Sequence, residues 1–326
     1  MIDVIEESEK MFEKGKVSIC VPTYNRPNLI VELLDSILNQ TYQNFEVIIT
    51  DNSDNLETKK IVESKYLDPR IRYYKNDKNL GMGGNAIKAF RLVTGEFFTF
   101  TPDDDVWIDA EKLEKQIGIL NRQKTINIVF SNAISIDYGG ERLSDFSTLY
   151  EAPAGSLLPA GELLPGAQTQ YFLNILTAVL RTEVLLPIFM ESFRFESEEY
   201  LCYYIAATDQ YIGFVPSQLV ALREAEHYRT AIEDGNVVDW KERKDIRIRQ
   251  VLGIYITLTA LHPETKNKLG TALVQNALGR HILDVAKSSR SFCLFVHALA
   301  ACKLHFRRFS LLGAMKIKSR SGKSFG

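Results

Sequence analysis

The chain has 326 residues, 45% of them hydrophobic and 25% charged, with a formal net charge of −2. This composition excludes a disordered, collagen-like or disulfide-dense protein, and the length suits one large domain with a smaller appendage. The charge is uneven, with 17 basic and 4 acidic residues from Lys241 onward against 22 and 37 in residues 1–240. The acidic part is therefore expected to hold a site built from carboxylates, and the basic part to face an anionic partner.

The N-terminal segment is acidic and lacks a long apolar core, so no signal peptide is expected. The longest apolar runs, near 251–261 and 292–302, have about 11 residues each, fewer than the roughly 20 that a membrane-spanning helix needs. The four cysteines form no Cys-x-x-Cys pair and are expected to be buried thiols in a reducing compartment. These features favour a cytoplasmic protein.

Strand-like and helix-like patterns alternate over the first 130 residues. Runs rich in β-branched and aromatic residues predict strands, and apolar residues at helical spacing between them predict helices. The expected strands are Val17–Val21, Phe45–Thr50, Ile71–Tyr74, Phe97–Thr101 and Ile126–Ser131, and the expected helices cover about 29–38, 58–66, 86–93 and 109–122. This alternation predicts an α/β fold, a mostly parallel sheet with flanking helices.

The remaining chain divides into two stretches of different character. Residues 139–169 are rich in Gly, Pro, Ser and Leu and predict an irregular excursion, after which strands are expected at 211–216 and 218–222. From about Trp240 the pattern is wholly helical, with helices expected at 242–261, 264–286 and 291–312 and a disordered basic tail from about 316. We therefore expect an α/β domain over 1–235 and an all-helical C-terminal appendage over 236–326.

Polar clusters follow three of the expected strands, at 23–26, 51–54 and 103–105. In open α/β sheets, ligands bind just beyond the carboxyl ends of the strands. Because these ends meet at one edge of the sheet, the three clusters are expected to converge there and form a binding site.

Three consecutive aspartates, Asp103, Asp104 and Asp105, come directly after a buried strand. Clustered carboxylates repel one another, so a cation usually offsets the repulsion. Mn²⁺ or Mg²⁺ bridging a diphosphate suits this cluster, because hard cations prefer oxygen ligands and keep substrate phosphates in their shell. The alternative is a solvated acidic turn that caps the next helix.

Two further segments are open to a functional and a structural interpretation. Asp51, which ends the second strand, can accept a hydrogen bond from a pyrimidine N–H, or can serve only as a turn residue. The glycine-rich turn from Asn79 to Asn85 opens a helix, so its backbone N–H groups can bind an anion, or the turn can be a simple connection.

Taken together, these segments resemble the opening of a family 2 glycosyltransferase with the GT-A fold. The motifs occur in the family's order and spacing: Pro22-Thr-Tyr-Asn-Arg26, Val47-Ile-Ile-Thr-Asp51-Asn-Ser, Asn79-Leu-Gly with Asn85-Ala, and Phe98-Thr-Phe-Thr-Pro-Asp103-Asp-Asp105. The resemblance is good over about residues 15–125 and weaker over 125–230. It implies an inverting, metal-dependent transfer of a sugar from a nucleotide-diphosphate donor to an acceptor.

The resemblance also implies roles for individual residues. The nucleotide contacts it implies are Pro22, Thr23, Tyr24, Asn25, Arg26, Asp51, Asn79, Gly81, Asn85, Asp103 and Asp104. Asp105 would ligate the metal ion, with Asp103 and His227 as further candidate ligands. Arg223, His227 and Arg229 would lie on a loop over the diphosphate, although His227 can equally be an ordinary, partly exposed histidine.

An inverting transfer also needs a base that deprotonates the acceptor hydroxyl. Family members often carry it in an acidic pair, frequently Glu-Asp, before a helix and a hydrophobic strand. Here Glu199 stands where the family usually has Asp, which makes it the candidate base, with Glu198 and Asp209 as alternatives. Acidic residues that favour a helix N-terminus through its dipole are the structural alternative.

The C-terminal stretch 292–312 alternates Phe and Leu with Lys and Arg, and no acidic residue follows Asp284. This composition is typical of an interfacial helix on an anionic membrane surface, and the alternative is a helix packed on the catalytic domain. We expect a peripheral protein on the inner face of the cell membrane, a saccharide or lipid-linked acceptor, and no nucleic-acid partner. The expected function is sugar transfer in cell-surface polysaccharide or lipopolysaccharide synthesis. The alternatives are an inactive nucleotide-sugar-binding scaffold and a nucleotidyltransferase.

Overall fold

The computed structural model describes residues 11–145, 155–160, 175–194, 199–209, 211–224 and 260–265. The strands in these ranges are β1 (Glu13–Thr23), β2 (Phe45–Asp51), β3 (Ile71–Lys75), β4 (Gly95–Phe100), β5 (Val106–Trp107), β6 (Ile128–Ile136), β7 (Arg142–Asp145), β8 (Ser156–Pro159), β9 (Val179–Arg181) and β10 (Tyr211–Arg223). The helices are α1 (Leu29–Leu38), α2 (Glu57–Lys65), α3 (Gly81–Arg91), α4 (Lys112–Arg122), α5 (Thr182–Arg194) and α6 (Glu199–Thr208), with short 3₁₀ turns at Ile175–Thr177 and Pro263–Thr265.

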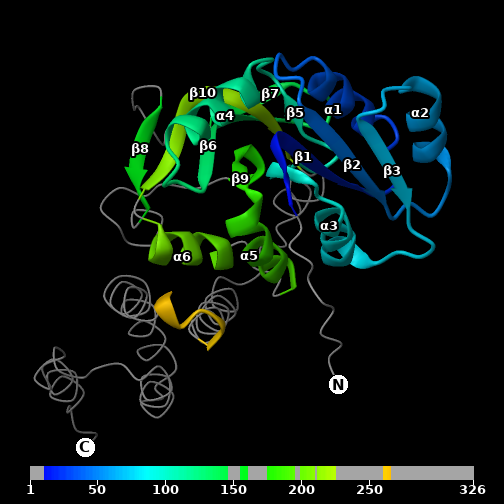
Figure 1. The fold of residues 1–326 in the computed structure, drawn as a ribbon. Coiled ribbons are helices and arrows are strands. Elements are labelled where there is room, and N and C mark those ends of the chain that lie inside the picture. The colour runs from blue at the N-terminus through cyan, green and yellow to red at the C-terminus, as the bar shows by residue number, and fades with distance from the viewer. Residues whose placement is uncertain are drawn as a thin grey trace, which may run out of the picture.

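The described strands pair into one mixed sheet in the order β3-β2-β1-β4-β9-β6-β10-β5, with β7 beside β6 and β8 beside β10 (Figure 1). The long strands pair in parallel, β3 to β4 on one side and β6 with β10 on the other. The short β9 is antiparallel to both β4 and β6 and joins the two halves. The predicted α/β fold with flanking helices is confirmed.

Alternate residues of each strand face opposite sides of the sheet, so the described residues form a hydrophobic core on each face. Val17, Ile19 and Val21 of β1 pack in one core with α1, α2 and α4, whereas Cys20 packs in the other with α3, α5 and α6 (Figure 1). The second core contains an aromatic cluster in which Phe90 has ring centroids 5.0–6.4 Å from four other phenylalanines. This cluster fixes α3 and α5 against β4.

Several expected boundaries differ from the structure. The two strands expected at 211–216 and 218–222 are the single strand β10, which keeps its pairing with β6 across two irregularities. The excursion expected to be irregular contains β7 and β8, each held by antiparallel pairing to a long strand. Helix α4 begins at Lys112, three residues after the expected start.

Most of the C-terminal region lies outside the described residues, and so do the expected domain boundary at 235 and the tail from about 316. In the described stretch 260–265, Nε2 of His262 lies 3.1 Å from Oε2 of Glu191 in α5. The His262 ring also contacts Tyr204 of α6 edge-on, with centroids 5.0 Å apart. In the ranges that the structure describes, no helix combines the length and the apolar character that spanning a membrane requires.

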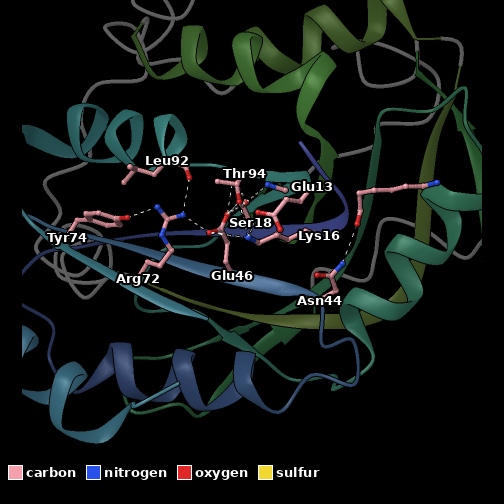
Figure 2. A network of polar contacts seen from close by, with 11 residues as sticks. Glu13, Lys16, Ser18, Asn44, Glu46, Arg72, Tyr74, Leu92 and Thr94 are labelled. Carbon is pink, nitrogen blue, oxygen red and sulfur yellow. Dashed lines mark hydrogen bonds and ion pairs between the residues drawn. The ribbon is translucent and has the colours of Figure 1, made fainter. Parts of the chain in front are cut away.

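At the amino edge of the sheet, the buried carboxylate of Glu46 is held by hydrogen bonds from several protein groups (Figure 2). Glu46 of β2 accepts hydrogen bonds from Ser18 at 2.7 Å, from the Thr94 hydroxyl at 2.6 Å and from Arg72 at 2.6 Å. Burial alone would raise the pKa of Glu46, but these hydrogen bonds and the charge of Lys16 outweigh it, and the pKa is lowered. Both carboxylate oxygens therefore have partners.

Candidate active site

The polar clusters predicted at 23–26, 51–54 and 103–105 lie together at the carboxyl edge of the sheet. Strands β1, β2 and β4 are parallel neighbours, with Thr23 opposite Asp51 and Pro22 opposite Thr50 in the register. The turns that follow these strands are therefore adjacent, and hydrogen bonds join them. The three clusters therefore converge, as the α/β pattern predicts.

Asp103 lies at the centre of this edge and is 3% exposed. Its Oδ2 accepts hydrogen bonds from the Thr23 hydroxyl at 2.6 Å and from the Tyr24 N–H at 3.3 Å. Its Oδ1 lies 2.9 Å from Nη1 of Arg26. Burial raises the pKa of Asp103 to about 6, against the opposing effects of Thr23 and Arg26.

Arg26 joins two of the three aspartates, because its Nη1 also lies 2.7 Å from Oδ2 of Asp104. The side chain is 40% exposed, so the guanidinium is partly accessible to solvent. It supplies a positive charge that offsets the repulsion between the two carboxylates.

Asp105 differs from Asp103 in one important respect. Its Oδ1 accepts a hydrogen bond from the Arg223 N–H at 3.1 Å, but its buried Oδ2 has no hydrogen-bond partner. Burial, with the charges of Asp104 and Asp103, raises the pKa of Asp105 well above its ordinary value. A buried carboxylate oxygen without a partner is destabilising unless a ligand satisfies it.

The segment 101–107 contains two further buried polar atoms without a partner, Oγ1 of Thr101 and Nε1 of Trp107. In the ranges that the structure describes, no other buried side-chain nitrogen or oxygen lacks a hydrogen bond. Glu46 at the opposite edge, by contrast, is fully satisfied. Each unsatisfied buried polar group in a native protein calls for an explanation, such as a bound ion or water, and Oδ2 of Asp105 is the one that belongs to the acidic turn.

The donor set around Asp105 fits a hard divalent cation, since carboxylate oxygens are its preferred ligands. No cluster of three or more His, Cys, Asp or Glu side chains suited to a metal occurs within the described ranges. Substrate phosphates and water normally complete the shell of Mg²⁺, so a single available carboxylate is compatible with such an ion. Of the expected ligands, His227 lies outside the described residues.

Asp51 ends β2 and is fully buried. Its Oδ1 accepts a hydrogen bond from the Ser53 N–H at 2.6 Å, and its Oδ2 accepts one from the Tyr73 hydroxyl. Burial and this contact raise the pKa of Tyr73 above its ordinary range. Tyr73 belongs to β3 and was not identified from the sequence, because only the register of β2 with β3 brings it to Asp51.

A buried network of asparagine amides holds the glycine-rich turn. Asn85 donates to the carbonyls of Thr23 and Thr50, at 3.2 and 2.9 Å, and accepts from Asn76 at 2.8 Å. Asn52 donates to Asn79 and to the carbonyl of Gly81, at 3.0 and 3.1 Å.

Asn85 is thus a buried anchor between β1 and β2, whereas the resemblance implies a nucleotide contact. Gly81 adopts φ +72°, a conformation that suits glycine at the start of α3. Asn76 was not identified from the sequence, where an isolated asparagine carries no pattern, and Asn52 was identified only as a member of the cluster 51–54.

The turn after β1 is tied to the turn after β2. Asn25 adopts the left-handed conformation with φ 54°, which asparagine tolerates better than most residues. Its side chain donates to Asp54 at 3.0 Å and accepts from the Asp54 N–H at 3.1 Å. Tyr24 also donates to Asp54, at 2.8 Å, and its ring is 45% exposed at this edge.

The guanidinium of Arg223, expected to contact the diphosphate, is occupied by protein partners. Its side chain is only 3% exposed, and its guanidinium donates to the carbonyls of Asp104 and Tyr138 and to Glu32. These partners leave little of the guanidinium for a substrate. His227 and Arg229, expected on the same loop, lie outside the described residues.

The three candidate bases have different positions. Asp209 receives hydrogen bonds from Asn127 at 3.1 and 3.2 Å, just before β10 and β6 begin. The whole length of β10 separates it from Arg223 and Asp105, so it lies at the wrong edge of the sheet for the base. Glu199 begins α6, while its side chain and the whole of Glu198 are outside the described residues.

Comparisons with known proteins find similar glycosyltransferases. Residues 18–172 match the model of glycosyl transferase family 2. A UDP-Glc:alpha-D-GlcNAc-diphosphoundecaprenol beta-1,3-glucosyltransferase of Escherichia coli is 31% identical over 185 residues, which cover 56% of this chain and 66% of that protein. An uncharacterised glycosyltransferase of Methanocaldococcus jannaschii is 34% identical over 137 residues, 41% of this chain and 47% of that protein.

Among solved structures, S. aureus TarS 1-349 in complex with UDP-GlcNAc superposes with a TM-score of 0.53 at 18% identity, over 93% of this chain and 76% of TarS. This similarity shows a shared fold. Three of the curated relatives are matched over 47%, 23% and 66% of their own lengths.

Proposed function

Because residues 18–172 belong to glycosyl transferase family 2, we propose that the chain transfers a sugar from a nucleotide diphosphate to a saccharide acceptor, with inversion and with Mn²⁺ or Mg²⁺. The observation that carries the proposal is Oδ2 of Asp105, a buried carboxylate oxygen of the acidic turn that has no hydrogen-bond partner. When bound, the metal ion neutralises charge on the leaving nucleotide diphosphate.

The residues of the chain hold the donor in this proposal. Thr23 and the Tyr24 N–H fix Asp103, which we assign to the ribose, and Asp51 receives the N–H of the base. Arg26 lies beside the acidic turn, and its partly exposed guanidinium would release an aspartate and bind a phosphate oxygen of the donor in its place. Asp105 contributes its unpartnered oxygen to the metal ion.

A uracil nucleotide is the proposed donor base. An aspartate that accepts a hydrogen bond suits the N–H of uracil or thymine, and the E. coli relative is described with UDP-Glc. The acceptor is proposed to be a saccharide on a lipid diphosphate, because that relative acts on a diphosphoundecaprenol-linked sugar. A lipid acceptor suits a peripheral position on the inner membrane face, to which the basic C-terminal region would dock.

Glu199 remains the proposed base, with Glu198 as the alternative. The position of Glu199 at the start of α6 supports the assignment, because it agrees with the acidic pair that precedes a helix in the family. A substitution of Glu199 by Gln should lower the transfer rate while donor binding is unchanged.

A thermal-shift panel of UDP, dTDP, CDP, GDP and ADP, each with Mn²⁺ or EDTA, tests donor binding. A ligand at 100 times its dissociation constant stabilises the native state by about 2.7 kcal/mol, which such a measurement detects. We expect stabilisation by UDP with Mn²⁺, loss of it with EDTA, and loss of it in the Asp105→Asn variant. Asp109→Asn, a carboxylate in the same connection that pairs with Lys115, is the matched control.

Transfer itself is tested with UDP-glucose and a synthetic GlcNAc-diphospholipid in anionic vesicles. If none of the nucleotides stabilises the protein in the presence of Mn²⁺, the proposal is contradicted. Donor binding without transfer to any lipid-linked saccharide would instead identify a nucleotide-sugar-binding scaffold. Formation of a UDP-sugar from UTP and a sugar phosphate, with release of pyrophosphate, would identify a nucleotidyltransferase.

A further inference from the structure

Arg223, the last residue of β10, holds three separate elements together. Its Nε donates to the Asp104 carbonyl at 2.9 Å, in the acidic turn. Its Nη1 donates to the Tyr138 carbonyl at 2.7 Å, in the turn between β6 and β7. Its Nη2 forms an ion pair with Glu32 of α1 at 2.6 Å.

The main chain of the same residue also contacts the acidic turn. The Arg223 N–H donates to Oδ1 of Asp105 at 3.1 Å, one residue beyond the carbonyl that its Nε binds. Residue 223 therefore forms hydrogen bonds with Asp104 through its side chain and with Asp105 through its backbone. The turn itself contributes only a long backbone hydrogen bond, 3.5 Å from the Asp105 N–H to the Pro102 carbonyl.

These contacts determine which oxygen of Asp105 is available. Oδ1 is occupied by the Arg223 N–H, and Oδ2 is the atom that is left without a partner. Groups behind a metal ligand commonly orient it in this way, and their removal weakens metal binding by roughly 10–100-fold. Since the guanidinium is buried and already bonded, it acts on the site through the Asp104 carbonyl, which holds the acidic turn against the Arg223 N–H that binds Asp105.

We propose that Arg223 is a positioning residue that presents Oδ2 of Asp105 to the divalent cation, and that it does not bind the diphosphate. This inference rests on the proposed function. It predicts that Arg223→Gln weakens Mn²⁺-dependent binding of UDP and direct binding of Mn²⁺, while the protein stays folded.

Arg181 offers a matched control at the amino edge of the sheet. Its side chain is 13% exposed, and its guanidinium donates to the carbonyls of Ile126 and Leu120, at 2.9 and 2.5 Å. Like Arg223, it ties a strand to neighbouring segments through main-chain oxygens, here α4 and the segment before β6, but at the opposite edge from the acidic turn. A general structural effect of losing a buried arginine should therefore appear equally in Arg181→Gln.

The experiment measures UDP binding by calorimetry at saturating and at limiting MnCl₂, and free Mn²⁺ by electron paramagnetic resonance. Arg223→Gln should raise the MnCl₂ concentration needed for half-maximal UDP binding about tenfold or more, and Arg181→Gln should leave it unchanged. Arg223→Lys, which keeps the charge but loses the planar fork, should fall between wild type and Arg223→Gln and serves if the latter does not fold.

An unchanged manganese requirement in folded Arg223→Gln or Arg223→Lys overturns the inference and leaves the proposed function standing. The same shift in Arg181→Gln also overturns it, because the effect would then be structural. If the wild type binds no UDP with Mn²⁺, the proposed function fails and the inference falls with it.

Discussion

The hydroxyl of Thr23 donates a 2.6 Å hydrogen bond to Oδ2 of Asp103, although 80 residues separate the two in the chain. Thr23 ends β1 and Asp103 lies in the turn after β4, and these strands are parallel neighbours. The contact is buried, and it opposes the effect of burial on the pKa of Asp103. One hydroxyl thus helps to keep a carboxylate ionised at the centre of the candidate active site.

Thr23→Val removes this hydroxyl and preserves the shape of the side chain. A hydrogen bond to a charged group contributes about 1.5–3 kcal/mol, so the variant should be less stable by a similar amount. UDP binding in the presence of Mn²⁺ should weaken about tenfold, since tenfold corresponds to about 1.4 kcal/mol. Urea denaturation and calorimetry measure the two effects.

Thr99→Val on β4 is the control for this prediction. The Thr99 hydroxyl is also buried and donates to the Ala178 carbonyl at 2.7 Å, away from the acidic turn. It should lose stability but retain UDP affinity. Equal UDP affinities for the Thr23→Val variant and the wild type would show that Thr23 serves only the fold.

Tyr73 is predicted to influence which nucleobase is bound. Its hydroxyl donates to Oδ2 of Asp51, and so fixes the carboxylate assigned to the base N–H. In Tyr73→Phe the carboxylate loses this constraint, and the preference for UDP over CDP should fall roughly fivefold, about 1 kcal/mol. Competition between the two nucleotides in the thermal-shift panel measures this ratio.

The Tyr73→Phe variant should retain its manganese requirement, because Asp51 is distinct from the metal-binding carboxylate. Tyr66→Phe is the control, since its hydroxyl donates to Asp35 at 2.7 Å on the surface of α1. An unchanged UDP-to-CDP ratio in Tyr73→Phe would separate Asp51 from base recognition.

Lys112 gives the protein a predictable dependence of stability on pH. It is fully buried in α4, where its Nζ donates to Gln116 at 2.8 Å and lies 4.4 Å from the centroid of the Trp107 ring. Burial lowers the pKa of Lys112 from 10.5 to about 7. Between these two values the unfolded chain holds a proton that the folded protein has lost, so stability rises with pH in that window.

Lys112→Met removes this contribution and keeps an apolar side chain of similar length. At pH 7 the variant should be more stable than the wild type by up to about 5 kcal/mol. Its advantage should fall by about 1.4 kcal/mol for each pH unit from 7 to 9.

Urea denaturation at pH 7, 8 and 9 measures the trend, with Lys115→Met, on the exposed side of α4, as the control. A stability difference that stays constant over this range would mean that Lys112 remains charged in the fold.

The elements and the acidic edge were predictable because their signals are local. Alternation of β-rich runs with helical spacing identifies the strands up to β4 and the helices between them, and the triad 103–105 follows its strand directly. The partners of these groups were not predictable in the same way. Tyr73 and Asn76 belong to no motif, and the burial and partners of Arg223 have no sequence signal, so only strand register and crossover connections bring these groups to the site.

The sequence by itself determined the α/β architecture, the resemblance to a family and the segments that form the candidate site, since periodicity and contiguous motifs depend on near neighbours in the chain. Only the tertiary structure decided which oxygen of which aspartate is left for a ligand. That outcome depends on burial and on donors as distant in the chain as Arg223, 118 residues after Asp105. The tertiary structure likewise showed that Asn85 anchors β1 to β2 and that Asp209 lies at the opposite edge of the sheet. The positions of these two residues depend on how the strands pair.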